Sequence, residues 1–308
     1  MLSFLPGPFL ATITSIFFIS SVIFWAFILF YPILLLKIIL TPTPWRKYAD
    51  SILTSIGECW VATNNSIIKL TQKIEWDVET QGELSKDESY LITANHQSWV
   101  DIVVLQRMFT GKGRAPFPRF FIKQELIWVP ILGLCWWALD FPFMKRFSRE
   151  YLDKNPHMRG KDIEATRKAC AHFKEKPVSI INFFEGTRFT SIKQRRQQSP
   201  FNHLLKPRAG GAAFTLSAMD GSIKKLIDVT IVYPSGEKQF GDLFTNRVRK
   251  IIVRTKVIDI PENYLSADYE NDEAFREDFQ NWINDLWLTK DQEIEMLLTQ
   301  EHSVEKQA

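Results

Sequence analysis

The chain has 308 residues, of which 45% are hydrophobic and 13% aromatic, and it carries a formal net charge of +3. This composition is ample for the core of one large domain and argues against an intrinsically disordered chain. A charge so close to zero is weaker than the basic footprint of a nucleic-acid-binding protein, so no nucleic-acid partner is expected. Three cysteines without metal-ligand spacing argue against both a metal site and a disulfide framework.

The amino-terminal segment is strongly apolar. Met1 to Leu36 contains no charged residue, and Phe9 to Leu40 is rich in Ile, Phe and Leu. About 20 residues cross a bilayer, and the basic start and small-residue cleavage site of a signal peptide are missing here. The sequence therefore predicts a membrane anchor over residues 1–44, although a buried core helix has a similar composition. Pro32 leaves open whether the anchor is one tilted helix or a shallower hairpin.

Positive charge follows this anchor. Lys37, Arg46 and Lys47 lie at or after its end, whereas the leader has no charged side chain. Loops rich in Lys and Arg tend to stay on the cytoplasmic side of a membrane. We therefore expect residues 45–308 to form one cytoplasmic domain.

Beyond the Pro-rich linker, strand-like and helix-like segments alternate, which predicts an α/β fold with a sheet flanked by helices. The expected strands are Ile74–Thr80, Tyr90–Ala94, Arg119–Lys123, Val178–Phe184, Leu226–Tyr233 and Lys250–Ile260. The expected helices are Trp99–Met108, Lys161–Glu175, Gly211–Ala218 and Glu273–Leu298.

One later stretch, Leu126 to Phe143, is also apolar and rich in aromatic residues. A proline and an aspartate interrupt it, so it is too broken to span a bilayer. Its tryptophans Trp128, Trp136 and Trp137 are typical of a membrane interface, which favours a lipid-facing patch or an acyl-chain pocket. Ordinary protein core remains an alternative.

The strongest candidate for catalysis is the segment Asn95 to Asp101, which follows an apolar strand. Within one regular helix, five residues would separate His96 and Asp101 by about 140° around the axis. The two side chains can bond only if His96 precedes the helix and Asp101, in its first turn, points back. A histidine bonded to a carboxylate has a fixed tautomer and can act as a base near neutral pH. Alternatively, Ser98 and Asp101 form a capping box and Asp101 has only a structural role.

A second strand delivers Glu185, Gly186, Thr187 and Arg188 at its end. The glycine permits a tight turn, and a guanidinium can bind a phosphate through two hydrogen bonds. The alternative is a surface turn with a weak ion pair. Downstream, the segment Leu204 to Gly211 places two cations before a helix start, which suits an anion, although a solvated basic loop has the same pattern.

These two segments, taken in their order along the chain, resemble sequence blocks of the glycerolipid acyltransferases that acylate lysophosphatidic acid. That family has an Asn-His-x4-Asp block and a Phe-Pro-Glu-Gly-Thr-Arg block, and here Phe184 replaces the proline. Four further segments match other blocks of the family, the third being similar to the lysocardiolipin acyltransferase branch: Phe121–Leu126, Phe141–Arg146, Leu204–Gly211 and Val229–Pro234.

The resemblance implies that His96, oriented by Asp101, takes a proton from an acceptor hydroxyl that attacks an acyl thioester. It also implies substrate-binding roles for Lys123, Arg146, Glu185, Gly186, Thr187, Arg188, Lys206 and Arg208. The expected acceptor is lysophosphatidic acid, and the acyl donor is acyl-CoA or acyl carrier protein, with no cofactor or metal. A chain of this kind is expected in the bacterial inner membrane, among phospholipids, with its catalytic domain in the cytoplasm.

Three alternatives remain open at the level of sequence. The acceptor can be a lysophospholipid with a larger headgroup, of the lysophosphatidylglycerol or lysocardiolipin type. A non-catalytic membrane protein that binds anionic lipid would keep the anchor and Arg188 but would not need His96. A lipid esterase would release free fatty acid without any acceptor.

Overall fold

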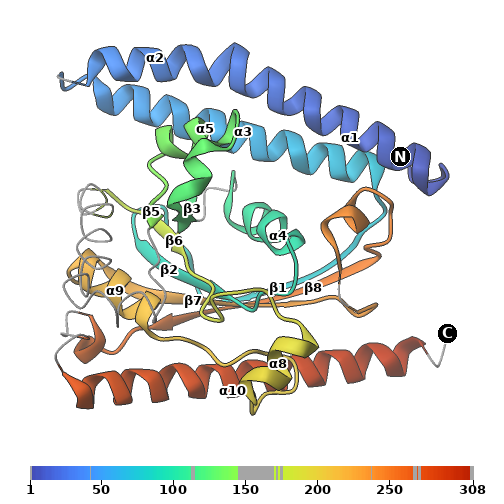
Figure 1. Cartoon of the computed structure of the whole chain (residues 1–308), viewed down its shortest axis with the longest axis vertical. Helices are drawn as coiled ribbons and strands as arrows, with labels where there is room; N and C mark the ends of the chain where they lie inside the picture. The colour runs from blue at the N-terminus through green and yellow to red at the C-terminus, as the bar shows by residue number, and fades with distance from the viewer. Residues whose placement is uncertain are drawn as a thin grey trace.

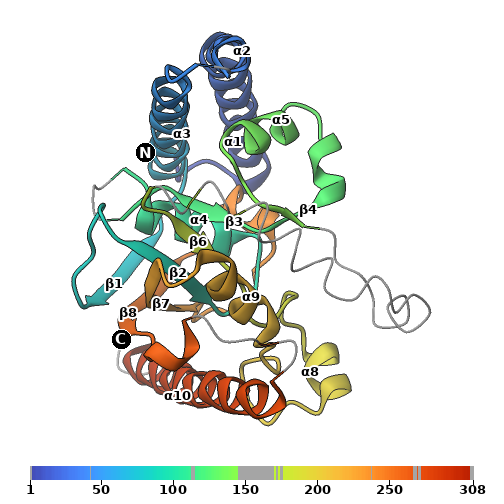
Figure 2. The same cartoon turned by 90° about the vertical axis from the view of Figure 1, so that its left-hand side faces the viewer.

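The structure is a computed structural model that describes residues 2–41, 43–111, 115–144, 170, 173, 176–236, 238–265, 269 and 272–305. Figure 1 shows three layers, with a helical hairpin over one face of a twisted sheet and a long carboxy-terminal helix under the other. Figure 2, turned by 90°, shows the same order of layers. The predicted α/β sheet flanked by helices is confirmed.

The main sheet has six strands in the order β1-β8-β7-β2-β6-β3. All neighbouring strands are parallel except β7 and β8, which are antiparallel. The strands are β1 (Glu75–Gln81), β2 (Ser89–Ala94), β3 (Pro118–Phe120), β6 (Ser179–Ile181), β7 (Ile223–Val232) and β8 (Lys250–Asp259). A separate two-stranded sheet pairs β4 (Ile122–Lys123) with β5 (Phe143–Met144).

Two hydrophobic cores lie on opposite faces of the main sheet. Alternate side chains of a strand point to opposite faces, so Ile92 of β2 joins the core under the hairpin and Leu91 joins the other. The first core also contains α4 (Val100–Phe109), and the second contains α9 (Gly210–Met219) and α10 (Glu273–Glu305). Burial on both faces explains why β2 is almost continuously apolar in sequence.

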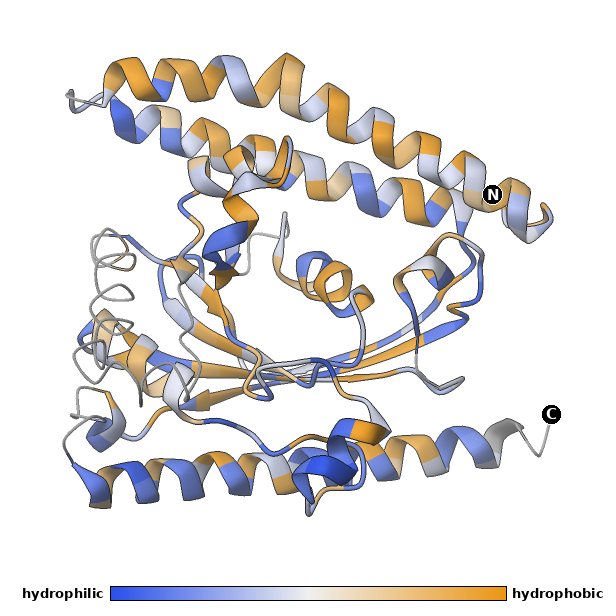
Figure 3. Cartoon of the chain, viewed as in Figure 1, coloured by the Kyte–Doolittle hydropathy of each residue, from blue (hydrophilic) through white to orange (hydrophobic). Residues whose placement is uncertain are grey.

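The apolar leader forms one unbroken helix that the structure divides into α1 (Gly7–Ile23), a π-helical segment η1 (Phe24–Phe30) and α2 (Tyr31–Leu40). Pro32 therefore does not end it. Among the described residues this is the one helix long and apolar enough to cross a membrane, judged by length and composition alone. Figure 3 shows how apolar it is along its length.

The chain then reverses into α3 (Arg46–Thr71), a helix that our sequence analysis did not predict. Its buried positions recur at the spacing of an amphipathic helix, which is the signal that was overlooked. They are Ala49, Leu53, Gly57, Val61, Ile68 and Thr71.

A buried lysine joins this hairpin to the domain. Lys37 is the single charged residue of the apolar helix, and its ammonium lies 2.8 Å from Asp50 of α3 and 3.2 Å from Asp140. It also donates a 2.8 Å hydrogen bond to the carbonyl of Ala138. Paired in this way, the charge tolerates burial and holds the end of α2 against two other segments. The domain boundary near residue 44 stays a prediction.

The other expected elements match the structure with shifts at their ends. Expected strand Arg119–Lys123 is divided between β3 and β4, and the strand expected at Val178–Phe184 shortens to β6 because the chain turns into the site. The helix expected at Lys161–Glu175 lies outside the described residues, apart from Cys170 and Phe173.

The aromatic stretch Leu126 to Phe143 contains η2 (Gln124–Trp128) in part and α5 (Leu132–Ala138). Trp128 is 86% exposed and Trp137 is 46% exposed, whereas Cys135 belongs to the first core. One face of this segment is therefore available to a lipid surface and the other is ordinary core.

Candidate active site

The candidate site lies at one edge of the main sheet, where three neighbouring strands end. Since β7, β2 and β6 are parallel to one another, their carboxyl ends meet at the same edge. The chain segments that follow them carry Tyr233, Asn95 to Asp101, and Phe183 to Arg188 respectively. Such an edge is where α/β proteins usually gather their functional groups.

Asn95 holds the first of these segments to the sheet. Its side-chain amide is fully buried and donates to the carbonyl of Ile231 at 2.8 Å, while its carbonyl oxygen accepts from the Ile231 N–H at 2.8 Å. The pair of bonds extends the β2–β7 pairing by one residue. It thereby fixes the point at which the backbone leaves the sheet for His96.

His96 and Asp101 form the bonded pair that the sequence predicted. His96 precedes α4 and Asp101 lies in its first turn, with 2.9 Å between the imidazole Nδ1 and the carboxylate Oδ2. This carboxylate accepts only, so Nδ1 carries the proton and Nε2 is left free to accept one. The geometric part of the prediction is confirmed, and the catalytic role remains to be tested.

Asp101 also caps the helix start. The same Oδ2 accepts the backbone N–H groups of Gln97 at 2.7 Å and Ser98 at 2.8 Å. The hydroxyl oxygen of Ser98 accepts from the Val100 N–H at 3.1 Å, two residues on, so only the Asp101 half of the expected capping box is formed. One side chain thus orients the imidazole and fixes the backbone that leads into α4.

An aromatic ring packs against the face of the imidazole. The rings of His96 and Phe183 are stacked, with centroids 4.0 Å apart and planes inclined by 17°. The His96 side chain is 13% exposed, so it remains partly accessible. Asp101 and Phe183 together hold the ring in one plane.

Glu185 carries a second buried carboxyl group. It is fully buried, and its two oxygens accept the backbone N–H groups of His96 at 2.8 Å and Leu205 at 2.9 Å. These bonds tie the loop after β6 to the backbone of the histidine. A role of Glu185 in substrate binding stays a prediction.

Arg188 lines an open cavity of about 610 Å³ beside Gln97, the residue that follows His96. Its guanidinium lies over the ring of Trp99, 5.1 Å from the ring centroid. The ammonium of Lys193 is held at 2.8 Å by both the Thr187 hydroxyl and the Arg188 carbonyl, and it lines the same cavity. Gly186 makes the preceding turn with a φ of +69°, a conformation that favours glycine.

Lys238 is a third cation on this cavity, and our sequence analysis did not single it out. It lies after β7 on a polar loop with no motif around it. We refer to Arg188, Lys193 and Lys238 together as the cationic groove.

Comparison with known proteins assigns the family. The model of the Acyltransferase family matches residues 75–234, which is about half of the chain and includes the whole of this edge of the sheet. The chain belongs to the acyltransferase family.

Curated relatives of this acyltransferase support that assignment at low identity. It is 27% identical over 172 residues to the mouse 1-acyl-sn-glycerol-3-phosphate acyltransferase epsilon, covering 52% of this chain and 45% of that protein. It is 24% identical over 244 residues to the mouse gamma enzyme of the same name, covering 72% and 59%. The match therefore spans about half to three fifths of the length of these relatives.

The fold is shared with a solved structure, the 1-acyl-sn-glycerophosphate (LPA) acyltransferase PlsC from Thermotoga maritima. The TM-score is 0.51 at 17% sequence identity, with 89% of this chain and 95% of that chain covered. At this identity the likeness supports the fold of the acyltransferase and nothing finer.

The structure shows fewer contacts for the other predicted substrate-binding residues of the acyltransferase, which are Lys123, Arg146, Lys206 and Arg208. Arg208 is exposed beside the Gly186 turn, and its backbone N–H donates to the Phe184 carbonyl at 2.8 Å. Lys206 is exposed on the same loop, and Lys123 is exposed on β4 of the small sheet. Arg146 lies outside the described residues.

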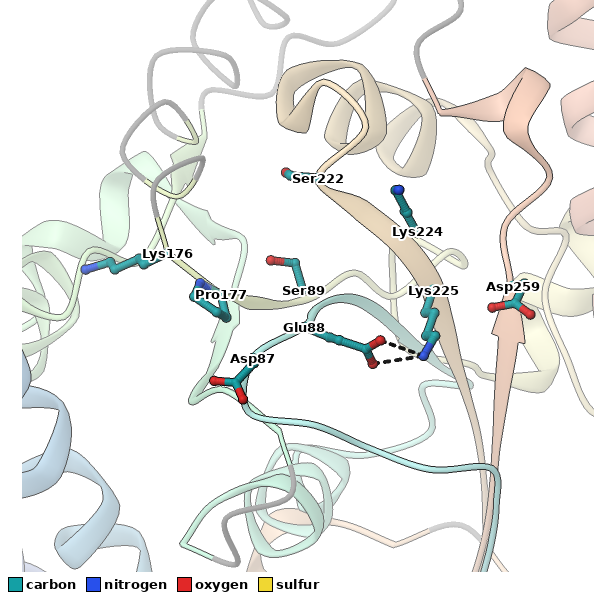
Figure 4. A pocket seen from close by; sticks show the side chains of 9 residues that line it. All are labelled: Asp87, Glu88, Ser89, Lys176, Pro177, Ser222, Lys224, Lys225 and Asp259. Atoms are coloured by element: carbon teal, nitrogen blue, oxygen red, sulfur yellow. Dashed lines mark hydrogen bonds and ion pairs between the residues drawn. The ribbon is translucent and has the colours of Figure 1, made fainter.

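A second cavity, of about 430 Å³, lies at the opposite edge of the sheet, near the amino ends of β2 and β7. Figure 4 shows Glu88 and Lys225 pointing toward each other there, at 2.8 and 2.9 Å. The hydroxyl of Tyr90 donates to the same carboxylate at 2.6 Å. No cluster of His, Cys, Asp and Glu suited to a metal ion occurs in the described part of the acyltransferase.

The buried carboxyl of Glu185 predicts a pH-dependent stability. Burial raises the pKa of Glu185 from 4.5 to about 8, more than its two N–H bonds lower it. The folded protein then holds a proton that the unfolded chain has released. This contribution to stability is full below about pH 4.5 and is lost as the pH rises through about 8.

We therefore expect the free energy of unfolding to fall between pH 5 and 8.5 more steeply in the wild type than in Glu185→Gln, whose amide does not titrate. Urea unfolding at several pH values measures the difference. The exposed Glu125→Gln serves as a control and should follow the wild type. Parallel curves for wild type and Glu185→Gln would contradict the prediction.

Proposed function

We propose that this protein transfers a fatty acyl group from acyl-CoA or acyl carrier protein to the free hydroxyl of 1-acyl-sn-glycerol 3-phosphate, forming phosphatidic acid. The observation that carries the proposal is the bonded His96–Asp101 pair beside the cationic groove. The names of the relatives, which are 1-acyl-sn-glycerol-3-phosphate acyltransferases, support the same acceptor. No cofactor takes part in the proposed reaction.

In the proposed mechanism, Nε2 of His96 accepts the proton of the acceptor hydroxyl as that oxygen attacks the thioester carbonyl. The Asp101 carboxylate stabilises the imidazolium that forms. When the tetrahedral intermediate collapses, the carbon–sulfur bond breaks and His96 returns the proton to the departing thiolate. The products are the new ester and the free thiol.

Direct transfer requires no acyl-enzyme. Ser98 is the hydroxyl nearest in sequence to the histidine, but it is 1% exposed and its oxygen accepts from the Val100 N–H. A nucleophile must be accessible and bonded to its base. The arrangement of Ser98 therefore favours a structural role.

The cationic groove provides a site for the acceptor's phosphate. Its three cations come from different segments, the turn after β6 for Arg188, the helix α8 (Ser191–Gln197) for Lys193, and the loop after β7 for Lys238. A guanidinium can bind two oxygens of a phosphate at once, and ammonium groups add charge. A phosphate held there lies beside Gln97, next to the proposed base.

We further propose that the apolar helix and the exposed face around Trp128 contact lipid in the bacterial inner membrane, with the rest of the chain in the cytoplasm. Large apolar side chains are exposed along the helix and on η2 and α5, which is costly in water and favourable in a bilayer. They include Phe9, Ile16, Ile19, Phe27, Ile28, Leu35, Trp128, Leu134 and Trp137. The acceptor and product of the proposed reaction are themselves membrane lipids.

The first test concerns the catalytic pair. His96→Ala should abolish acyl transfer because no base remains, and Asp101→Asn should lose orders of magnitude in kcat because the imidazole loses its tautomer control. Transfer of radiolabelled acyl groups from acyl-CoA to lysophosphatidic acid in detergent measures both. His203→Ala is the matched control, since His203 is also bonded to a carboxylate, at 2.7 Å from Glu295, and should retain activity.

The two alternatives without acyl transfer give different results. A protein that only binds anionic lipid shows no transfer in the wild type, and an esterase releases free fatty acid without acceptor. Near-native turnover by His96→Ala would contradict the proposed mechanism.

A second test concerns the phosphate. Arg188→Ala should raise the acceptor KM and lower kcat/KM by about tenfold to a hundredfold, since a hydrogen bond to a charged group contributes about 1.5 to 3 kcal/mol. The donor KM should stay the same, as should both constants in the exposed Arg196→Ala. With monoacylglycerol, which has no phosphate, wild type and Arg188→Ala should be equally poor. Unchanged use of lysophosphatidic acid would leave Lys193 and Lys238 as the phosphate ligands.

A third test concerns orientation in the membrane. Of the described cysteines, Cys59 is exposed and Cys135 and Cys170 are buried, so Cys59→Ser leaves no reactive thiol among them. Adding Lys86→Cys, on the exposed turn before β2, then reports the side on which the domain lies. An impermeant maleimide should label this cysteine only after the cells are permeabilised. Labelling in intact cells would place the domain outside.

A further inference from the structure

Tyr233 makes a contact with the catalytic pair that our sequence analysis did not predict. It is the first residue after β7, is 3% exposed, and donates its hydroxyl hydrogen to Oδ1 of Asp101 at 2.6 Å. The other oxygen of that carboxylate bonds His96 and the two backbone N–H groups at the helix start. Tyr233 thus bonds Oδ1, whereas the imidazole and the two backbone N–H groups bond Oδ2.

The position of this hydroxyl is set by the sheet. The backbone of Ile231, two residues earlier, is bonded twice to the side chain of Asn95, the residue before His96. The tyrosine and the histidine are therefore carried by two strands locked together within a few residues of both side chains. A carboxylate held at both oxygens cannot rotate about its terminal bond.

We propose that Tyr233 is a positioning residue for acyl transfer, whose hydroxyl fixes the plane of the Asp101 carboxylate against Nδ1 of His96 and withdraws part of its negative charge. This inference rests on the proposed function, because it assigns the residue a role in the same reaction. It adds a third side chain to the pair of His96 and Asp101 that the sequence predicted.

The hydroxyl remains a donor throughout the working pH range. Burial, together with the neighbouring Asp101 carboxylate, raises the pKa of Tyr233 well above its usual value. The titratable groups around the imidazole are Asp101, which bonds its Nδ1, and Glu185, which bonds its backbone N–H. Of these, only Asp101 is bonded to Tyr233.

Tyr233→Phe tests the proposal because it removes the hydroxyl and keeps the ring. We expect kcat to fall about tenfold, with the KM of donor and acceptor changed less than twofold, since the carboxylate loses the bond at Oδ1 that fixes its plane while Oδ2 stays bonded to Nδ1. With one donor fewer, the carboxylate holds the imidazolium proton more strongly. The acidic limb of the kcat/KM profile should therefore move to higher pH.

Tyr90→Phe is the matched control. Tyr90 is also fully buried on the same sheet and donates to a carboxylate at 2.6 Å, but at the opposite edge, where Glu88 pairs with Lys225 (Figure 4). Loss of its hydroxyl should lower thermal stability to a similar degree and leave the pH profile of transfer unchanged. A Tyr233→Phe profile that coincides with that of the wild type and Tyr90→Phe would overturn the proposal, whatever its effect on stability.

A readout without turnover separates this inference from the proposed function. The ¹⁵N imidazole signal of His96, assigned by its absence in His96→Ala, reports the pH at which the ring gains its proton. This pH should be higher in Tyr233→Phe than in the wild type or Tyr90→Phe, even if the substrate is misassigned. An identical titration in all three proteins overturns the role of Tyr233, whereas a shifted titration without transfer in the wild type overturns only the proposed reaction.

Discussion

A carboxylate that is completely buried has to be surrounded by donors, because an uncompensated charge away from water costs several kcal/mol. Asp101 meets this requirement with a tyrosine hydroxyl, an imidazole N–H and two backbone N–H groups. These donors come from the end of β7 and the loop after β2, and Asp101 itself lies in the first turn of α4. The need to satisfy one charge therefore brings together the segments that build the site.

Glu185 extends the same arrangement on the other side of the histidine. Its two oxygens bond the backbone of His96 and of Leu205, so the loops after β6 and before α9 are fixed relative to the imidazole. Two cations of the groove, Arg188 and Lys193, lie on the segment between Glu185 and Leu205. A rigid interior with exposed binding groups is a suitable basis for the precise placement that proton transfer needs.

The amino-terminal hairpin is joined to this domain through charge as well as through apolar packing. Lys37 bonds Asp50 of α3 and Asp140, and Asp140 closes the aromatic segment whose exposed face carries Trp128. The apolar helix and the tryptophan face therefore keep a defined relation to each other. In the proposed function, this relation would set how the domain approaches the lipid that contains its acceptor.

The local patterns of the chain determined its fold class, the apolar leader and the central strands, since strand alternation and helix caps depend on neighbours in sequence. They also determined the bonded pair of His96 and Asp101, because its geometry follows from where α4 can begin. They were less informative for α3, whose amphipathic spacing was present but lies between a polar linker and a strand and was overlooked.

The tertiary structure decided what depends on contacts between distant residues. Glu185 is buried and bonded to the backbone of a residue 89 positions away, a contact that no local pattern indicated. Tyr233 is 132 positions from Asp101, and no local pattern relates the two. Lys238 likewise becomes a neighbour of Arg188 only because β6 and β7 end at one edge, whereas Lys193 lies close to Arg188 in sequence. Sequence spacing specifies which side chains can meet within an element, whereas the order of strands in the sheet specifies which elements meet.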